Sequence, residues 1–458
     1  MRIEKDSLGT VEVPLNSLWG AQTQRALNNF KIGDNLMPLP LIFALTQIKK
    51  SAAIINNRLN LISNEKKDLI VNASDQIIEG RHNDQFPLPV WQSGSGTQTN
   101  MNVNEVISNI VLHKKNLPLG SYKEIHPNDD VNKSQSTNDV FPSATHIATV
   151  NEIKKRLLPE IDLLIKALGK KATQWESITK IGRTHLQDAV PLTLGQEVSG
   201  WMNQILNASK RIEKSLEDLL YIPIGGTAVG TGLNAPDNFD VLITEDIANS
   251  TGFKFKSTRN KFSQMASHDE LVNTMSCLKL LAVSLLKIVN DIRLLSSGPR
   301  TGIGELELPD NEPGSSIMPG KVNPTQCEAM AMICTQIIAL EVGVTMAGSG
   351  GHLQMNVYKP LIAFNILTSV NLLSDACHSC RTKMITGIEP NRINIKSYVE
   401  NSLMLVTSLT PRIGYERACK IAQLAHKKNL TLREASEKLG FINNKEFDNL
   451  ININMTQK

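Results

Sequence analysis

The sequence has few aromatic residues, little alternation of apolar and polar residues, and only a small excess of charge. Phe, Trp and Tyr together make up 4% of the 458 residues. Because β-strands favour aromatic residues and an apolar period of two, this composition argues against an extensive sheet. The formal net charge is +4, from 48 basic and 44 acidic residues, which is too small to indicate nucleic-acid binding.

The N-terminal stretch MRIEKDSLGTVEVP lacks the apolar core of a signal peptide and the basic amphipathic pattern of a transit peptide, so we expect a cytoplasmic protein. Six cysteines are scattered through apolar segments, which is typical of reduced, buried thiols rather than of a disulfide framework. Cys377 and Cys380 have the spacing of a metal or redox pair, but the sequence offers no second pair to complete a site. We therefore expect no metal and no cofactor.

Apolar residues recur mainly at intervals of three and four, the period of an α-helix. The sequence predicts a mainly all-α fold around a bundle of long helices, at about residues 40–61, 99–114, 143–173, 190–220, 264–295, 325–347 and 360–386. Two of these helices are apolar nearly all round. Glu341, Asn365 and Asn371 interrupt them too early for a membrane span, so we expect no membrane insertion. Helices that need cover on every side indicate a bundle that continues across the subunits of a homo-oligomer.

The pattern divides the chain into three parts: an N-terminal domain (1–135), a central helical-bundle domain (136–387) and a small C-terminal helical domain (388–458). The first boundary falls in the polar loop HPNDDVNKSQSTND. The second falls at GIEPNR, after which the helices become shorter and more charged.

The segment PGSSIMPGKVNPTQCE, residues 313–328, is a shaped loop that runs into a long apolar helix. Its prolines exclude a regular helix, and Gly314 and Gly320 permit backbone angles that other residues avoid. Such a loop can be a plain surface connection. We expect Ile317 and Met318 to anchor it to a core, and the following helix directs its N-terminus back at the loop, which indicates an anion site.

Three other polar segments interrupt the helical pattern: QSGSGTQTNMNVNE (92–105), NKSQSTNDVFPSATH (132–146) and GRTHLQDAVPLTLGQE (182–197). Taken singly, each could be a cap for the helix that follows it. Four such segments together hold many hydroxyls and amides, one prominent lysine and one histidine. That set of donors favours a composite site for a small carboxylate.

Glu328 and His185 each permit two interpretations. Thr325 and Glu328 have the spacing of a capping box, in which Glu328 would return to the N-cap amide. Alternatively, Glu328 orients and charges His185, which would make the imidazole a competent proton donor or acceptor near neutral pH. His185 taken alone could also be a core histidine with satisfied hydrogen bonds.

Side by side, these segments resemble the fumarase/aspartase superfamily of lyases. The stretches SLGTVEVP, LWGAQTQRA, GSGTQTNMN, SQSTNDVFP, GRTHLQDAVPLTLGQE, GGTAVGTGLN and GSSIMPGKVNPTQ occur in the family's order and spacing, over essentially the whole chain. Within the superfamily the chain resembles the class II, iron-independent fumarate hydratases. Aspartases typically carry glutamine at the position of His185 and alanine at that of Gly320. Thr137 stands where many fumarases have serine, which keeps the hydroxyl.

The resemblance implies reversible addition of water to fumarate, giving L-malate, through a carbanion intermediate. It implies that Ser315 is the base, that Lys321 helps to stabilise its alkoxide together with loop amides near Gly314 and Gly320, and that His185 paired with Glu328 is the acid. The substrate-binding residues that it implies are Ser95, Thr97, Ser136, Thr137, Asn138, Thr184, Lys321 and Asn323.

The resemblance also implies partners and a second site. A four-carbon dicarboxylate would be the substrate, and a homotetramer would build each site from segments of three subunits. His126, Asn128 and Asp129 match a secondary dicarboxylate site, although the same residues could simply cap a helix.

Three other functions compete with this interpretation. An ammonia lyase of the same fold is disfavoured by the residues at His185 and Gly320. A structural protein that kept the fold would usually have lost part of the set Ser315, Lys321, Asn323, His185 and Glu328. An iron–sulfur hydratase would need a cysteine cluster that the sequence does not offer.

Overall fold

The computed structural model describes residues 1–453 and is mainly helical, which confirms the fold class expected from the sequence. The chain divides into two compact units. Unit 1 comprises Met1–Pro159, Ala208–Ala282 and Cys334–Ser374. Unit 2 comprises Glu160–Asn207, Val283–Ile333 and the chain from Asp375 onward. The three domains expected from the sequence stay a prediction.

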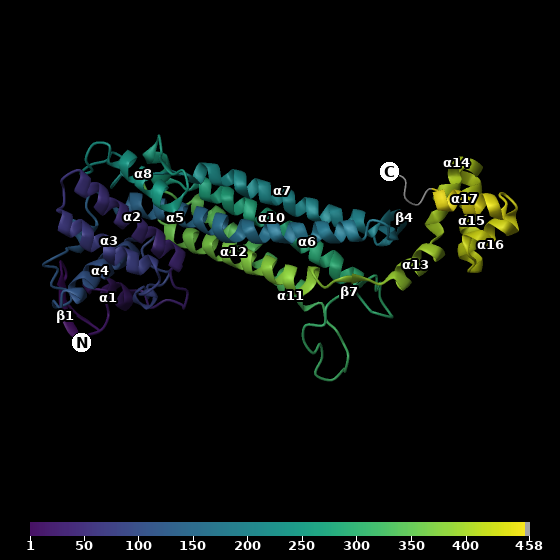
Figure 1. Cartoon of the computed structure of the whole chain (residues 1–458), viewed down its shortest axis with the longest axis horizontal. Coiled ribbons are helices and arrows are strands. Elements are labelled where there is room, and N and C mark those ends of the chain that lie inside the picture. Colours follow the sequence, from purple (N-terminus) through teal and green to yellow (C-terminus); the bar gives the residue numbers. More distant parts are fainter. Residues whose placement is uncertain (454–458) are drawn as a thin grey trace. The chain divides into compact units, whose positions relative to one another are not determined.

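Unit 1 is built around helix α2, which is buried on nearly every face and contacts α3, α5 and α8 (Figure 1). Leu41, Ile42, Leu45 and Ile48 on α2 are at most 1% exposed. The elements of this unit are β1 (Arg2–Asp6), β2 (Gly9–Val13), α1 (Ala21–Asn29), α2 (Leu39–Arg58), α3 (Asn64–Ile78), α4 (Thr97–Lys114), α5 (Thr137–Glu152), β5 (Tyr221–Ile222), α8 (Phe239–Thr251), β6 (Lys256–Ser257) and α9 (Lys261–Ala266).

Long helices contribute residues to both units. They are α6 (Leu158–Gln174), α7 (Leu194–Leu219), α10 (Asp269–Leu295), α11 (Thr325–Gly348) and α12 (Lys359–Cys380).

Polar contacts join neighbouring long helices within each unit. In unit 2, Trp201 of α7 donates to Asp291 of α10 at 3.0 Å. In unit 1, Lys279 of α10 lies 2.8 Å from the carboxylate of Glu341 on α11, and Asn365 of α12 donates to a backbone carbonyl of α11. Two of the polar residues that interrupt the apolar helices, Glu341 and Asn365, therefore bind neighbouring helices.

By length and composition alone, α10, α11 and the segment 359–385 could each cross a membrane. Glu341 instead forms polar contacts to a neighbouring helix, as expected in a bundle. Several apolar side chains of α11 are open to solvent in the single chain: Met332, Val342 and Met346 are 68%, 57% and 67% exposed. Exposed apolar surface of this kind usually marks an interaction site.

Unit 2 holds the hairpin β3–β4 and the C-terminal helices. Its further elements are β3 (Thr179–Thr184), β4 (Gln187–Thr193), β7 (Leu306–Glu307), β8 (Glu389–Pro390), α13 (Arg392–Asn401), α14 (Thr410–Ile413), α15 (Tyr415–Lys428), α16 (Leu432–Leu439) and α17 (Asn444–Ile453). The C-terminal helices enclose a core in which Leu409, Ile421 and Ala435 are fully buried.

The hairpin β3–β4 ends in a strained two-residue turn. Thr184 pairs with Gln187, so His185 and Leu186 form the turn between the strands. Their φ angles are +57° and +60°. Positive φ at both positions suits the twist of a hairpin, but such turns normally use Asn and Gly. A leucine with positive φ is a rare and strained choice, of the kind that persists mainly at functional sites.

A buried ion-pair network holds the hairpin at its base. Glu305 is fully buried, and its carboxylate oxygens lie 2.9 Å from Lys180 Nζ and 2.9 Å from Arg183. Lys180, which is 1% exposed, also donates to Glu197 at 2.7 Å. Because an unpaired buried charge is very costly, these contacts fix the strand from which Thr184 and His185 project.

We predict that Leu186→Gly stabilises the hairpin. Glycine adopts positive φ without steric cost, and the Leu186 side chain is 71% exposed, so little apolar contact is lost. The free energy of unfolding should rise by up to about 1 kcal/mol, seen as a higher melting temperature. Val190→Gly is the matched control, because Val190 is 55% exposed on the extended strand β4 and glycine should destabilise it. Equal destabilisation by both changes would contradict the assignment of strain to the turn.

Candidate active site

The first polar segment forms the N-terminus of α4. Gly96, with φ of +81°, precedes the helix, and the hydroxyls of Ser95 and Thr97 lie 2.9 Å apart there. A Cβ on Gly94 would lie 1.4 Å from the carbonyl oxygen of Val357, so only glycine fits this close approach. The segment therefore presents hydroxyls at a helix start, an arrangement that suits an anion, although the Thr99 amide of the first turn already donates to Gln92 Oε1 at 3.1 Å.

The second polar segment forms the N-terminus of α5. Ser136 caps the helix: its hydroxyl accepts from the amide of Asn138 at 3.3 Å, and Asp139 accepts from the amide of Ser136 at 2.9 Å. The capping interpretation is thus confirmed for Ser136. Thr137 is 8% exposed, and Asn138 donates to the carbonyl of Ala228 at 2.7 Å. Residues 136–138, which the sequence predicts to bind a ligand, are called the substrate turn below.

Asp139 connects the substrate turn to a second loop. Its other carboxylate oxygen accepts from the amides of Gly225 and Thr227, each at 2.9 Å. The side chain is fully buried, and burial raises the pKa of Asp139 to about 6, although these amide hydrogen bonds oppose the rise. Thr227 has positive φ, so the carboxylate holds a strained loop against the helix start.

Asn100 joins the two polar segments of unit 1. It lies in the first turns of α4, is 1% exposed, and donates to the hydroxyl of Thr137 at 3.0 Å. The structure therefore brings together five of the predicted binding residues in one unit: Ser95, Thr97, Ser136, Thr137 and Asn138. Thr184, His185 and the residues of the 313–328 segment lie in unit 2.

The Pro313–Pro324 loop in unit 2 extends away from the helices in Figure 1, between β7 and α11. Its ends are joined at a narrow neck, where Asn323 donates to the carbonyl of Gly314. A Cβ on Gly314 would lie 1.8 Å from the carbonyl oxygen of Lys321. Lys321 itself is exposed.

Ser315 sits inside this loop, and its hydroxyl oxygen accepts from two backbone amides. The amide of Ile317 lies at 3.3 Å and that of Met318 at 3.0 Å. The expectation that Ile317 and Met318 anchor the loop in a core is wrong for the single chain, where they are 83% and 48% exposed. No core surface reaches them because the loop stands clear of the helices.

Glu328 lies in the first turn of α11 and is exposed. The expected capping box is not formed. Helix α11 begins at Thr325, so its N-cap is Pro324, which has no amide, and the Thr325 amide donates to the Asn323 carbonyl at 2.9 Å. Within residues 1–453, no hydrogen bond or ion pair of one chain joins Glu328 to His185, which is also exposed.

His126, predicted to be part of a secondary site, caps the short turn Pro127–Val131. Its Nδ1 accepts from the amides of Asn128 and Asp129 at 3.3 and 3.2 Å, and a carboxylate oxygen of Asp129 lies 3.4 Å from the same nitrogen. Capping therefore accounts for the conformation of His126. In the part of the chain that the structure describes, no cluster of three or more His, Cys, Asp or Glu side chains could hold a metal ion.

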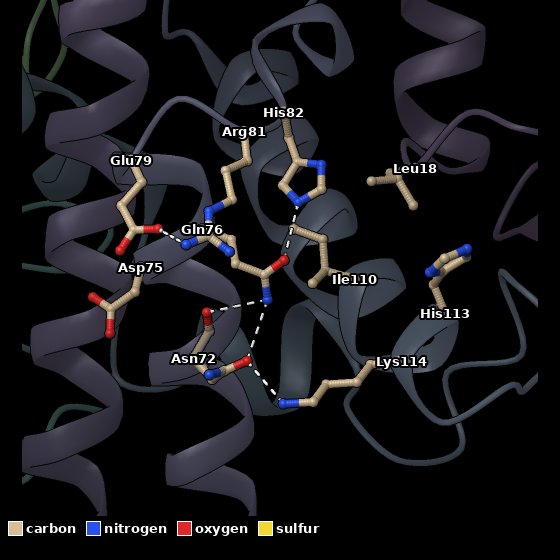
Figure 2. A pocket seen from close by; sticks show the side chains of 10 residues that line it. All are labelled: Leu18, Asn72, Asp75, Gln76, Glu79, Arg81, His82, Ile110, His113 and Lys114. Atoms are coloured by element: carbon tan, nitrogen blue, oxygen red, sulfur yellow. Dashed lines mark hydrogen bonds and ion pairs between the residues drawn. The ribbon is translucent and has the colours of Figure 1, made fainter.

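A cavity of about 590 Å³ lies elsewhere in unit 1, at the C-terminal ends of α3 and α4 (Figure 2). None of the predicted site residues lines it. Its polar side chains bind one another: Gln76 contacts His82 at 3.2 Å and Asn72 at 3.2 Å, and Lys114 donates to Asn72 at 3.1 Å (Figure 2). The cavity thus offers few unpaired groups to a ligand.

Sequence reasoning missed the buried charges that support the predicted site segments within each unit: Lys49 and Asp139 in unit 1, and Lys180 and Glu305 in unit 2. Lys180 and Glu305 precede polar segments that were singled out for other residues. Asp139 lies inside one of those segments, in which the hydroxyl and amide side chains were the predicted binding groups. Lys49 carried a usable signal, because it is a charged residue in the middle of a long, largely apolar helix.

Comparisons with known proteins identify the family. The family described as Lyase matches residues 9–339, and the family described as Fumarase C C-terminus matches residues 405–457. A fumarate hydratase class II of Prochlorococcus marinus is 64% identical over 98% of this chain and 97% of that protein. Another, from Thermosynechococcus vestitus, is 52% identical over 99% of this chain and 97% of its own.

Among solved structures, the recombinant class II fumarase from Schistosoma mansoni superimposes with a TM-score of 0.95 at 42% identity, covering 98% of each chain. The match extends over both compact units and includes every segment that carries a predicted site residue. The chain therefore belongs to the class II fumarate hydratases of the fumarase/aspartase superfamily.

Proposed function

We propose that this chain catalyses the reversible hydration of fumarate to L-malate, a step of the tricarboxylic acid cycle, through side chains alone and in the cytoplasm. One observation carries the proposed chemistry. The hydroxyl oxygen of Ser315 accepts hydrogen bonds from two backbone amides, and the same loop carries Lys321 and Asn323. This arrangement suits an oxygen that must carry negative charge.

In the elimination direction, Ser315 acts as the base. Its alkoxide removes a proton from the malate carbon beside one carboxylate; the C–H bond breaks, an O–H bond forms, and the electron pair spreads onto that carboxylate. A serine hydroxyl is too weak a base without help. Lys321 and the amides of Ile317 and Met318 stabilise the alkoxide, whereas the sequence had suggested amides near Gly314 and Gly320.

Lys321 and Asn323 bind the carboxylate on which charge accumulates. One amide hydrogen of Asn323 is used at the neck of the loop, and the second remains for the substrate. Because the carboxylate gains charge in the transition state, these contacts strengthen there. Removing one such donor should raise the barrier by about 3 kcal/mol, or slow the reaction by about a hundredfold.

His185, oriented by Glu328, supplies the acid. Acting through a bound water, it donates a proton to the departing hydroxyl, so the C–O bond breaks and water leaves. Thr184 joins Ser95, Thr97 and the substrate turn in binding the carboxylates and the hydroxyl. The strained turn that carries His185 holds the imidazole at an exposed tip, where it can approach another chain.

We propose a homotetramer in which each site takes segments from three subunits. Two observations support this. Apolar side chains of α11 are exposed in the single chain, and His185 and Glu328 are both exposed without contacting each other. Assembly would cover the apolar side chains of α11 and would bring His185 of one subunit to Glu328 of another. Light scattering of the purified protein tests the assembly, and the mass of a monomer would contradict it.

His126, Asn128 and Asp129 are proposed as a secondary dicarboxylate site, supported by the half-exposed imidazole of His126. Calorimetry with L-malate on an inactive Ser315→Ala protein tests it. Two binding events per chain are expected, and one would refute the secondary site.

The reaction itself is tested by ultraviolet absorbance of the metal-stripped protein with L-malate, and separately with L-aspartate. Formation of fumarate creates a conjugated double bond that absorbs. Absorbance should rise with L-malate alone. A rise with L-aspartate would indicate an ammonia lyase, and no change with either substrate would favour a non-catalytic role.

Ser315→Ala should lower kcat by about a thousandfold or more, because it removes the base. The change is small and lies in an exposed loop, so melting temperature and oligomer size should stay the same. Ser316→Ala is the matched control on the adjacent exposed residue and should change kcat by less than about tenfold. A near-normal rate for Ser315→Ala would refute its role as the base.

His185→Asn should lower kcat by about a hundredfold or more, since general acid catalysis contributes on this scale. Asparagine tolerates positive φ, so the hairpin should keep its conformation. His426→Asn, at an exposed position on α15, is the control and should leave the rate unchanged. Unaltered kinetics in His185→Asn would return His185 to a structural role.

A further inference from the structure

Lys49 on α2 is a buried cation without a direct ion pair. Its side chain is fully buried, and its ammonium group donates to two neutral amide oxygens, Asn132 Oδ1 at 2.8 Å and Gln135 Oε1 at 3.0 Å. In the described chain no carboxylate lies within ion-pair distance of Lys49. The nearest influence of opposite sign is Asp139, whose oxygens already accept backbone amides.

Burying a lysine among neutral partners is unfavourable for folding. Burial lowers the pKa of Lys49 to about 7, and the charge of Asp139 only partly opposes this. Burial of Lys49 lowers the stability of the fold, and Lys49 is linked by hydrogen bonds to Thr137, a predicted binding residue. Perturbed ionisable groups of this kind often have a functional role.

A short hydrogen-bonded chain leads from Lys49 to the substrate turn. Asn132 Oδ1 accepts from Lys49 and also from the side-chain amide of Asn100 at 3.2 Å. The same amide group of Asn100 donates to Thr137 Oγ1 at 3.0 Å. Because Thr137 accepts this bond, its own hydroxyl hydrogen remains available to a ligand. Asn132 Oδ1 is thus an acceptor that Lys49 and Asn100 share, and Asn132 and Asn100 connect the ammonium to the Thr137 hydroxyl.

The second bond of Lys49 fixes the start of the substrate turn. Gln135 immediately precedes Ser136, and its side-chain amide also donates to the carbonyls of Val131 and Lys133, at 3.1 and 3.0 Å. Lys49 thus restrains the backbone that leads into Ser136 as well as the hydroxyl of Thr137. Both effects come from one group that never touches the ligand itself.

We propose that Lys49 is a positioning residue whose buried charge makes the substrate turn selective for a carboxylate over a neutral group. The proposal rests on the proposed function of this site. The donors on the turn and at the start of α4 are all neutral hydroxyls and amides, which would accept a carboxylate or a carboxamide alike. A bound carboxylate favours the protonated form of Lys49, and a cation in a medium of low dielectric constant adds an attraction that only the carboxylate feels. Lys321 would serve the other carboxylate of the substrate.

The experiment compares Lys49→Met with Lys50→Met. Methionine keeps the length of the side chain and removes the charge. Lys50 is the matched control: it is the next residue on α2 but pairs with Asp75 at 2.6 Å near the surface, so its loss changes the net charge equally. Each protein is assayed for kcat and KM with L-malate. Calorimetry then measures the Kd of succinate, which cannot react, and of succinamate, in which one carboxylate is an amide.

In Lys49→Met, the Kd of succinate and the KM of L-malate should rise by about tenfold or more, since a charged partner is lost in a buried setting. The Kd of succinamate should rise clearly less than that of succinate, because both ligands lose the restraint that the Lys49 hydrogen bonds place on the turn, but only a carboxylate at the turn loses the charge. The value of kcat should change by less than about threefold. Lys50→Met should match the wild type. Equal weakening of succinate and succinamate, or no change in either, would overturn the proposal.

Lys49→Gln separates charge from hydrogen bonding, because its amide can still donate to Asn132. It should show the same loss of selectivity as Lys49→Met. If both variants lose the melting temperature and oligomer size of the wild type, Lys49 is a structural residue and the proposal is wrong. A wild-type protein inactive with both fumarate and L-malate would instead refute the proposed function, which the same assays detect separately.

Discussion

The carboxylate of Asp139 is the contact on which the arrangement of unit 1 depends. One of its oxygens accepts a hydrogen bond from a backbone amide of the substrate turn, and the other accepts hydrogen bonds from two amides of the Gly225–Thr227 loop. Three amide donors are what allow a fully buried carboxylate to remain partly ionised despite a pKa near 6. Without that charge, two loops far apart in sequence would lose their common attachment, and Thr227 would lose the support for its positive φ.

Unit 2 uses the same physical device at a different place. Glu305, fully buried, lies within ion-pair distance of Lys180 and Arg183, and so fixes the strand that ends in Thr184. In both units, polar residues at the surface are held by charges in the interior. Interior charges are costly unless paired, and a displaced loop would break the pairing. The start of α5 and the hairpin β3–β4 are therefore held more firmly than their own exposed contacts would allow.

Much of the fold could be predicted from the sequence, because a helical period of apolar residues is a local property that survives into the structure, as in α2 and α10. The polar segments were recognisable for the same reason. The contacts between residues far apart in sequence could not be predicted. Examples are the hydrogen bond from Lys49 to Asn132 and the ion pair between Glu305 and Lys180. The exposure of Ile317 and Met318 could not be predicted either. The sequence shows that these side chains are apolar, but it does not show which surface of this chain or of another chain covers them.

The exposure of the Pro313–Pro324 loop bears directly on how a serine could act as a base. Two amides aimed at Ser315 stabilise an alkoxide weakly while water competes for the same oxygen, and strongly once water is excluded. Ile317 and Met318, which supply those amides, also carry the apolar side chains that would exclude water on closure. Under the proposed function, covering these side chains and activating Ser315 as the base would be one event. The base would become strong only when the loop is covered, which protects the open enzyme from holding a costly alkoxide in solvent.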